Sequence, residues 1–570
     1  MLSCAWTEDA NLWSSAARAK LRRDSSETDE TTRNEPAPSL PVPPPADPTP
    51  IEPTGQLPDD PTKPPPGYGQ IRPPLSLPDV STLTHHALAG YEVVAIYGRP
   101  DLSSEKLGYL RLGARLRVGP KIDGQGCPTG FHAIAQGGFA CTNKGLVVDP
   151  ERPPYMKQVP PPPRLETPLP YDYAYVSKWN APMWWRIPTE QELVEMNRQR
   201  AMREAQRLAA EKIAKGEVEL TGPSLPGPIR VPTLALPGLH EAEPDAAGPD
   251  DKVEPVTPAR IDGKPKTESS TLPSAASDTR IGVEQAEPII KLPLNPERPW
   301  LERGFFISLG EVVRESGRSY WNTARGAYVW QGDTIRHQAK DFIGVVLGEN
   351  VQYPFGWVAT KEAKLFEPTP NGRLRMVKVV ERRTFLDLND EVVVNGKTYM
   401  STSDGLLVED NRVVVPDLQD LPDGLDTWDR WIDVSLEKQL LMAYEGTRPV
   451  YATLISTGKK GTEEDPFETP AGRYRIYSKQ VSSNMDGNTA SDGNYSIQDV
   501  PWTMFFEGSY ALHGAFWHRG FGSVRSHGCV NLGPSDARWL FFWTTPFLPD
   551  GWHGVHATEE SPGTTVIVRL

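Results

Sequence analysis

The chain has 570 residues, a formal net charge of −14 and 59 prolines. The negative charge argues against a nucleic-acid-binding surface, which would be basic. No apolar run reaches the roughly 18 residues that a membrane-spanning helix needs, and the length suffices for roughly two to four domains. Proline is about twice as frequent as in an average protein and is concentrated in a few stretches, which predicts linkers between folded parts.

Residues 1–87 have the composition of a disordered tether, because their Pro, Asp, Thr and Ser leave too little apolar surface to offset the chain entropy of folding. Cys4 lies in a Leu-Ser-Cys-Ala sequence before this tether, which resembles the end of a bacterial lipoprotein signal. One hypothesis is that Cys4 is lipidated and anchors an exported chain, with the true start codon upstream. The other is that Cys4 is an incidental residue of a disordered tail. Mass spectrometry of the native N-terminus would distinguish the two.

Residues 88–149 contain short runs of β-branched and aromatic residues separated by Gly, Pro and Asp, a spacing typical of a small β-barrel. The pattern resembles bacterial SH3-like domains. Cys127 and Cys141 lie on segments that would adjoin in such a domain, fourteen residues apart. In an oxidising compartment they would form a disulfide, worth about 3 kcal/mol for a loop of this length. Otherwise they would be two buried thiols.

Residues 150–299 are predicted to be a linker with one charged helix over residues 189–216. Thr189 and Glu192 have the spacing of a capping box, in which each side chain satisfies a backbone amide of the other residue. The charges of this helix outweigh its apolar stripe, which favours a solvated helix or one lying on a neighbouring domain. Residues 217–290 are rich in Pro, Ala, Asp and Glu and are expected to be disordered.

Residues 300–425 return to β-like patterning, and we expect one or two small β modules there. The Asn395-Gly396 pair between two apolar runs predicts a β-hairpin, because both residues tolerate the positive φ angles of a tight two-residue turn. A structural spacer is the simpler interpretation of these modules, and ligand binding is the alternative.

The most informative stretch lies near the C-terminus, where His513-Gly514 is followed by Ser526-His527-Gly528-Cys529 and then Asn531. A thiol is a weak nucleophile until it becomes a thiolate, and a nearby imidazole can take its proton and stabilise the charge. His513 precedes Cys529 by sixteen residues, too many for one helical turn or a tight loop. The imidazole must therefore come from a neighbouring strand or a returning loop.

This pattern resembles the signature of the L,D-transpeptidase catalytic domain, the YkuD-like family. Two further stretches support the resemblance. Trp431–Val434 leading to Gln439–Leu441 is similar to the family's opening hairpin, and Ile455–Gly458 followed by Glu468–Ile476 is similar to its strand-turn-strand signature. The resemblance covers residues 428–570 and implies a mostly-β catalytic sandwich. The predicted fold class is therefore mainly β, with small SH3-like modules and long proline-rich linkers before this domain.

The resemblance assigns roles to the residues of the motif. Cys529 would be the nucleophile, and His513 would act as general base toward its thiol and then as general acid toward the leaving amine. The carbonyl of Gly514 would orient the His513 ring, and backbone amides around Gly528 and Cys529 would form an oxyanion hole. His527 is the alternative base, although a role in shaping the site suits it better. Two further residues of the motif, Ser526 and Asn531, would stabilise the conformation of the site.

Other residues near the motif suggest a substrate groove. Trp517 would form part of its wall. Arg525, together with Arg519, would pair with the carboxylates of a diaminopimelate stem peptide, unless these arginines are simply solvated. Residues 482–496 are rich in Ser, Asn, Asp and Gly, which predicts a mobile lid that shields an acyl intermediate.

The sequence therefore predicts an L,D-transpeptidase of the bacterial cell envelope, periplasmic or lipid-anchored, with peptidoglycan stem peptides as its partners. It would form 3→3 cross-links or attach a protein to the wall, without a cofactor and without nucleic acid. The alternatives are an L,D-carboxypeptidase, in which water replaces the amine, and a non-catalytic wall-binding scaffold. A zinc site is disfavoured because His527 and Cys529 are closer in sequence than usual ligand pairs, and a papain-type protease because its cysteine signature is absent.

Overall fold

The computed structural model describes residues 79–215, 290–339, 341–348, 350–462, 466–489 and 493–570. The predictions of a tether before residue 79, of lipidation at Cys4 and of disorder over residues 217–289 lie outside these residues. The chain divides into two units, Ala205–Lys291 and the remainder, and every feature below lies in the remainder apart from the end of one helix. The described residues are mainly β, as predicted, and none of their helices is long and apolar enough to cross a membrane.

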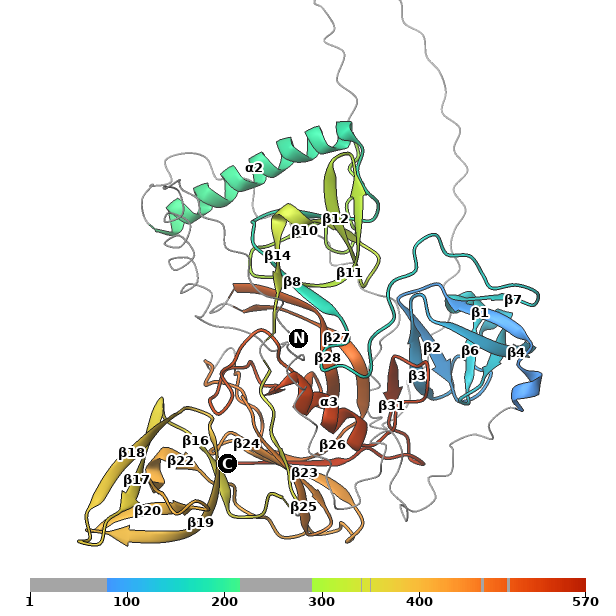
Figure 1. Ribbon diagram of the computed structural model, residues 1–570. Coiled ribbons are helices and arrows are strands. Elements are labelled where there is room, and N and C mark those ends of the chain that lie inside the picture. The colour runs from blue at the N-terminus through green and yellow to red at the C-terminus, as the bar shows by residue number, and fades with distance from the viewer. Residues whose placement is uncertain (1–78, 216–289, 340, 349, 463–465, 490–492) are drawn as a thin grey trace, which may run out of the picture. The chain divides into compact units, whose positions relative to one another are not determined.

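The first β module comprises residues 85–149 (Figure 1). β1 pairs antiparallel with β4 and β7, β2 pairs with β3 and β6, and β5 lies between β4 and β6. The module begins before the predicted residue 88, because His85 and His86 also pair with β4. Its strands are β1 (His85–Ala89), β2 (Val93–Tyr97), β3 (Lys106–Arg111), β4 (Arg115–Gly124), β5 (Cys127–Ile134), β6 (Phe139–Cys141) and β7 (Leu146–Asp149).

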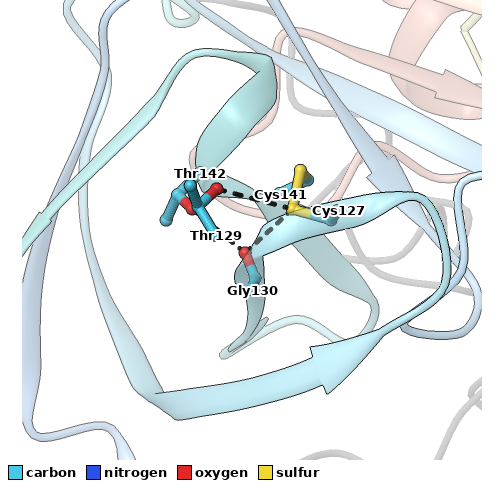
Figure 2. The surroundings of a disulfide bond; sticks show 5 residues. All are labelled: Cys127, Thr129, Gly130, Cys141 and Thr142. Carbon is cyan, nitrogen blue, oxygen red and sulfur yellow. Dashed lines mark hydrogen bonds between the residues drawn. A yellow bond between two sulfur atoms is a disulfide. The ribbon is translucent and has the colours of Figure 1, made fainter.

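A disulfide joins Cys127 at the start of β5 to Cys141 at the end of β6, with Cα atoms 6.1 Å apart. Figure 2 shows the residues beside it: the Thr142 hydroxyl donates to the Thr129 hydroxyl (2.6 Å) and to the Gly130 carbonyl oxygen (3.1 Å). The cross-link reinforces two strands that backbone pairing already holds together. It is the pair that the sequence analysis expects in an oxidising compartment.

The predicted linker over residues 150–299 is wrong in its middle, because residues 172–184 contain two strands. β8 (Asp172–Val176) lies between β11 (Phe306–Glu315) and β14 (Thr334–His337), and β9 (Ala181–Trp184) pairs with β10 (Trp300–Leu301) and β13 (Tyr328–Trp330). With β12 (Arg318–Thr323) they form the second β module. β8 and β9 are short, prolines precede β8, and their partners lie beyond residues 216–289, so no local pattern marks them.

Helix α2 (Glu190–Ala214) begins where the capping box predicts a helix. The Thr189 hydroxyl accepts from the Glu192 amide (3.4 Å), while the Glu192 carboxylate accepts from the Thr189 amide (2.8 Å) and from Arg186 (2.7 Å). Leu193 and Met196 are buried in one apolar cluster with aromatic side chains of the second β module. The start of the helix therefore lies on a neighbouring module rather than in solvent.

The third β module, residues 355–414, is a seven-stranded sheet in the order β18-β17-β21-β20-β19-β16-β22. Asn395 and Gly396 form the expected hairpin turn, with φ angles of 52° and 76° and with Val394 opposite Lys397. The strands are β16 (Phe355–Val358), β17 (Glu362–Pro368), β18 (Leu374–Glu381), β19 (Phe385–Val394), β20 (Lys397–Thr402), β21 (Leu407–Glu409) and β22 (Val413–Val414).

The C-terminal domain, residues 430–569, contains helix α3 (Pro534–Trp543) and two sheets, one of which is extended by strand β15 from an earlier segment (Figure 1). Apolar side chains of both sheets and of the helix share one core. One sheet has the order β15-β25-β24-β23-β32-β26, with strands β15 (Val345–Val346), β23 (Arg430–Ser435), β24 (Leu440–Glu445), β25 (Arg448–Leu454), β26 (Gly472–Arg475) and β32 (Thr565–Arg569). In the other, β27 lies between β31 and β28, and β29 lies between β28 and β30. Its strands are β27 (Ser478–Thr489), β28 (Gly493–Glu507), β29 (Tyr510–Gly514), β30 (Val530–Leu532) and β31 (Gly554–His556).

The loop predicted for residues 482–496 is wrong, because most of this segment lies in the paired strands β27 and β28, whereas a lid role for this hairpin stays a prediction. The two strands pair from Ser478 opposite Phe505 onward, and residues 490–492 lie outside the described residues. Polar composition does not indicate a loop here, because polar side chains of the hairpin are buried and bonded. The Ser482 hydroxyl, for example, donates to the Asp499 carboxylate at 2.9 Å.

A buried polar cluster at Asp499, the Asp499 cluster, joins the C-terminal domain to the first two β modules. The Arg111 guanidinium of β3 donates to both carboxylate oxygens of Asp499, at 2.5 and 2.9 Å. Ser308 of β11 donates to the same carboxylate (2.5 Å), and the Tyr173 hydroxyl of β8 donates to the Asp499 carbonyl oxygen (2.5 Å). Burial acts to raise the pKa of Asp499, but the charges of Arg111 and Arg325 outweigh it and hold this pKa well below its usual range. The cluster therefore contains an ionised carboxylate and fixes β28 to both modules.

Candidate active site

Strand pairing closes the sequence gap between the predicted base and nucleophile. β29 and β30 are parallel, with Leu512 opposite Val530 and His513 opposite Asn531. His513 and Asn531 therefore project from the same face of the sheet. Cys529 comes directly before β30, so its backbone lies beside the strand that carries His513. This is the neighbouring-strand arrangement that the spacing of the motif predicts.

His513 is fully buried, with 0% of its surface exposed. Its Nδ1 lies 3.4 Å from the carbonyl oxygen of Gly514, the partner that the family resemblance implies. Its Nε2 is buried and has no hydrogen-bond partner among the described residues. Burial lowers the pKa of the imidazole to about 4, so the ring is neutral at pH 7. With the proton on Nδ1, facing the carbonyl, Nε2 has a lone pair that can accept another proton.

The turn from Ser526 to Cys529 is held by its own first side chain. The Ser526 hydroxyl donates to the Cys529 carbonyl oxygen (2.5 Å) and accepts from the Gly528 amide (3.2 Å). Gly528 has a φ of 118°, and a Cβ there would lie 2.2 Å from the Tyr510 ring, so a larger residue does not fit without a shift. Ser526 thus positions the turn. The Gly528 amide, expected to donate to an oxyanion, donates to the Ser526 hydroxyl in this structure, and its oxyanion role stays a prediction.

The second motif supports this turn from another segment of the chain. The Thr469 hydroxyl donates to the Gly528 carbonyl oxygen at 2.6 Å and accepts from the Gly458 amide at 2.9 Å. Ser456 exchanges two backbone hydrogen bonds with Asn531, each of 2.9 Å. Sequence reasoning gave Thr469 and Ser456 no individual role. The signal available for them was their place in the family's strand-turn-strand signature.

A further support, also missed from the sequence, runs from Gln439 through Thr457 to the start of the turn. The Gln439 side chain donates to the Thr457 hydroxyl (2.6 Å) and accepts from the Thr457 amide (2.9 Å). The Thr457 carbonyl oxygen accepts from the amides of Arg525 (2.9 Å) and Ser526 (3.0 Å). The turn that carries Cys529 is therefore fixed by hydrogen bonds from three separate segments, those of Gln439, Ser456–Thr457 and Thr469, with Gln439 acting through Thr457.

His518 and Asn531 interact beside His513. The Gly520 amide donates to His518 Nδ1 (3.1 Å), and the Asn531 side-chain amide lies 2.9 Å from His518 Nε2. Because Nδ1 accepts, the neutral ring carries its proton on Nε2. The Asn531 nitrogen faces that proton, and exchanging the nitrogen and oxygen of the amide would give both the proton and the otherwise unpartnered Asn531 oxygen a hydrogen bond. Burial, and then the charge of Arg525, lower the pKa of His518 to about 3. Among the described residues, no group of three or more His, Cys, Asp or Glu is placed to hold a metal ion.

Trp517, expected as a groove wall, lies directly against the predicted base. Its ring stacks on His513 with centroids 5.7 Å apart and planes 25° apart. The neighbouring Phe516 stacks on Tyr173 of β8 (3.9 Å), and the Phe516 carbonyl oxygen lies 2.9 Å from His337 Nε2 of β14. The second β module therefore packs on the loop that orients the base.

His527 lies between two aromatic rings. The Tyr495 ring stacks on it with centroids 5.6 Å apart, and Phe467 meets it edge-on at 4.4 Å. The side chain is buried, with 1% of its surface exposed. These contacts fit a residue that shapes the turn by packing.

The remaining predicted residues, Cys529 and Arg525, differ in exposure. Cys529 is 1% exposed and lies in an apolar cluster with Trp517, and its Sγ is 3.7 Å from the Ser509 carbonyl oxygen. Arg525 is half-buried, and its side chain crosses Gly520, where a Cβ would lie 1.8 Å from the arginine Nε. The structure thus gathers the predicted catalytic residues at the β29–β30 pair, with Arg525 at their border.

Comparison with known proteins finds a family model and relatives that are similar to this part of the chain. Residues 429–568 match the family model YkuD, the L,D-transpeptidase catalytic domain, which confirms the resemblance for these residues. L,D-transpeptidase 1 of Mycobacterium tuberculosis is 30% identical over 133 residues, which are 22% of this chain and 51% of that protein. The chain therefore spans about half the length of the curated relatives it matches. The SH3-like nature of the first module stays a prediction.

Two solved structures are similar to the same region. The catalytic domain of the E. faecium L,D-transpeptidase is 25% identical, and the match covers 25% of this chain and 98% of that domain with a TM-score of 0.19. An L,D-transpeptidase from Xylanimonas cellulosilytica is 24% identical, and the match covers 26% of this chain and 64% of that chain with a TM-score of 0.19.

Proposed function

We propose that the protein is a peptidoglycan L,D-transpeptidase of the bacterial cell envelope, with Cys529 as nucleophile and His513 as general base. The observation that carries the proposal is the register of β29 and β30, which sets the backbone of Cys529 beside the strand of a buried, neutral His513. The family match over residues 429–568 supports the same chemistry. The tetrapeptide stem of peptidoglycan would be the acyl donor, and the reaction would serve cell wall biogenesis.

In the first half-reaction, Nε2 of His513 takes the proton of the Cys529 thiol, and the thiolate attacks the carbonyl carbon that precedes the terminal residue of the stem. The C–N bond then breaks, the imidazolium gives its proton to the leaving amine, and a thioester remains on Cys529. The Gly514 carbonyl holds the proton on Nδ1, so the ring needs no carboxylate partner. Backbone amides near Cys529 would stabilise the oxyanion by roughly 3 kcal/mol per donor.

In the second half-reaction, an amine takes the acyl group. The amine attacks the thioester carbonyl, its proton passes to His513, and the C–S bond breaks to restore the thiol. An amine from a second stem would give a 3→3 cross-link, and an amine of a protein would attach that protein to the wall. His527 packs between aromatic rings, and we therefore assign it to shaping the turn and not to proton transfer.

Labelling by a carbapenem tests the nucleophile, because the lactam carbonyl of such a compound acylates an activated thiolate. The full chain, kept under reducing conditions, is incubated with the carbapenem and weighed intact. We expect one adduct on the unsubstituted chain, none on Cys529→Ala, and a much slower reaction for His513→Gln. No adduct on a chain with both residues intact would favour the wall-binding scaffold.

The fate of the acyl group requires a second assay. The enzyme is incubated with purified disaccharide-tetrapeptide, and the products are separated and weighed. A cross-linked dimer is the expected product. Release of the terminal residue without dimer formation would instead identify an L,D-carboxypeptidase, since the acyl-enzyme half of both reactions is the same.

A lipid anchor at Cys4 remains a separate hypothesis, because this residue lies outside the described part of the chain. Growth of the producing cells with a labelled fatty acid would test it. Incorporation that is lost in Cys4→Ala would support a lipoprotein, and an unmodified Met1 in the native protein would contradict it.

A further inference from the structure

The third β module brings two adjacent arginines to the loop that follows His518. Arg382 and Arg383 lie in the turn between β18 and β19. Arg382 donates to the Gly522 carbonyl oxygen at 3.0 Å and to the Ser523 hydroxyl, although 140 residues separate Arg382 from Gly522. The turn is therefore fastened to a loop of the C-terminal domain.

That loop, residues 519–525, begins and ends with an arginine of its own. Arg519 is exposed, whereas Arg525 is half-buried and lies across Gly520. The Ser456 hydroxyl donates to the Gly520 carbonyl oxygen at 3.0 Å, which fixes the middle of the loop. Because Ser456 also pairs with Asn531, the loop is held to the strand that follows Cys529.

Four like charges therefore meet at one place, and this arrangement is costly. Burial, and then the charges of Arg382, Arg519 and Arg525, lower the pKa of the Arg383 guanidinium. Arg383 also has a φ of 69°, a left-handed conformation that is unfavourable for a non-glycine residue. Neither Arg382 nor Arg383 forms an ion pair with a carboxylate within the described residues. Strain and repulsion at one position are typical of functional sites, and a bound anion would relieve the repulsion.

The cluster also reaches the proposed catalytic residues. His518, which interacts with Asn531, lies within the electrostatic influence of both His513 and Arg383. A ligand held by the arginines would therefore lie beside the base and the turn that carries Cys529.

We propose that Arg382, Arg383, Arg519 and Arg525 form a carboxylate-binding site beside the candidate active site, so that the third β module supplies part of the substrate-binding surface. The ligand class is a peptide with free carboxylates near the bond to be cleaved, and in this respect the inference rests on the proposed function. Arginine suits this role because its planar guanidinium binds a carboxylate through two parallel hydrogen bonds. The sequence motif points only to Arg519 and Arg525, whereas the fold adds the other two.

A binding measurement tests this site separately from catalysis. In a Cys529→Ala background, calorimetry compares two tetrapeptide stems, one with a free diaminopimelate side-chain carboxylate and one with that carboxylate amidated. With Arg383 present, we expect the free carboxylate to bind about tenfold more tightly. Arg383→Gln should remove most of this preference, and Arg383→Lys should restore part of it, because the charge returns without the planar fork.

Arg373→Gln is the matched control, since Arg373 is exposed and precedes β18, whereas Arg383 follows the opposite end of that strand. This control should keep the full preference for the free carboxylate. Equal affinities for the two peptides with Arg383 present, or an unchanged preference in Arg383→Gln, would overturn the inference. Carbapenem labelling of the unsubstituted chain tests the proposed function independently. Absence of an adduct would contradict that function, whether or not the carboxylate preference is found.

Discussion

The buried polar groups at Asp499 and at His513, both in the C-terminal domain, differ in how completely they are hydrogen-bonded. In the Asp499 cluster, the carboxylate accepts from Arg111, Ser308 and Ser482, so the charge is surrounded by donors. At His513, the imidazole Nε2 and the Nε1 of the adjacent Trp517 are buried without a hydrogen-bond partner among the described residues. An unpaired buried polar group costs about 1–3 kcal/mol, so the second arrangement gives up stability that the first one gains.

The Asp499 carboxylate holds modules together, whereas His513 is the group that we propose takes part in the reaction. A saturated carboxylate has no capacity left to exchange a proton with a ligand, and it suits the junction of β3, β8, β11 and β28. An imidazole with one open nitrogen can take a proton only because nothing else donates to it. Substitutions in the Asp499 cluster should therefore change stability, and substitutions at His513 should change activity.

The largest expected effect is the loss of activity in His513→Gln. We expect the rate of dimer formation from disaccharide-tetrapeptide to fall roughly 1,000-fold or more, because the amide cannot accept the thiol proton. The free energy of unfolding in urea should change by less than about 1 kcal/mol, since the replaced ring already has an unpaired nitrogen. A variant that unfolds easily yet retains its activity would reverse the roles assigned to the two clusters.

Asp499→Ala should have the opposite profile. Removing the carboxylate leaves the Arg111 guanidinium buried without its counter-charge, which is expected to cost about 3–5 kcal/mol of unfolding free energy. Glu367→Ala removes the partner of Arg375 in an exposed ion pair and should cost less than about 1 kcal/mol, which makes it the control.

The sign of the pH dependence follows from the lowered pKa of Asp499. The contribution of this carboxylate is fully present above its ordinary pKa of 3.8 and is lost as the pH falls through the lowered value of the folded state. The difference between the unsubstituted chain and Asp499→Ala should therefore persist from about pH 8 to pH 5. A difference that disappears within this range would show that the pair is not the source of the stability.

Local chemistry explains which features the sequence predicts. The catalytic motif, the capping box at Thr189 and the Asn395-Gly396 turn each depend on residues that are near one another in the chain or on types that one reaction requires. β8 and β9 have no such signal, because their partners come from a distant segment. The polar composition of residues 482–496 predicts a loop, but Ser482 of this segment donates to the buried Asp499 carboxylate. That carboxylate is also held by Arg111 and Ser308 of other modules, which no local window contains.

The contact between the Arg382–Arg383 turn and the loop of residues 519–525 could not be predicted from the sequence for the same reason. These residues follow a β-strand in a separate module, and only the fold shows that Arg382 bonds to the loop before Cys529. The sequence therefore suffices to propose the reacting groups of this site, while the groups that position the turn and border it require the structure.

Titration of His513 sharpens the comparison further. In Cys529→Ala, nuclear magnetic resonance of the labelled ring should give a pKa of about 4, well below the ordinary 6.5, because burial disfavours the imidazolium. The urea-unfolded chain provides the reference. Between these two values only the unfolded ring takes up a proton, so this residue disfavours folding increasingly as the pH falls from 6.5 to about 4. A measured pKa near 6.5 would mean that water reaches the ring and that the site is not the dry cluster described above.

The smallest effect is expected for Thr469→Val. This substitution tests a residue that positions the turn and that should affect both stability and activity, unlike Asp499 or His513. The hydroxyl joins the Gly528 carbonyl oxygen to the Gly458 amide, and valine has nearly the same shape without it. We expect a stability loss of about 1–2 kcal/mol and roughly a tenfold lower rate of acylation by a carbapenem, since both partners lose a buried hydrogen bond and the turn loosens. Thr469→Ser should retain both properties, because it keeps the hydroxyl. An equal loss of stability in the two variants would attribute that loss to packing and not to the hydroxyl. A slower acylation in Thr469→Val alone would show that the thiol's reactivity depends on the conformation of this turn as well as on the open nitrogen of His513.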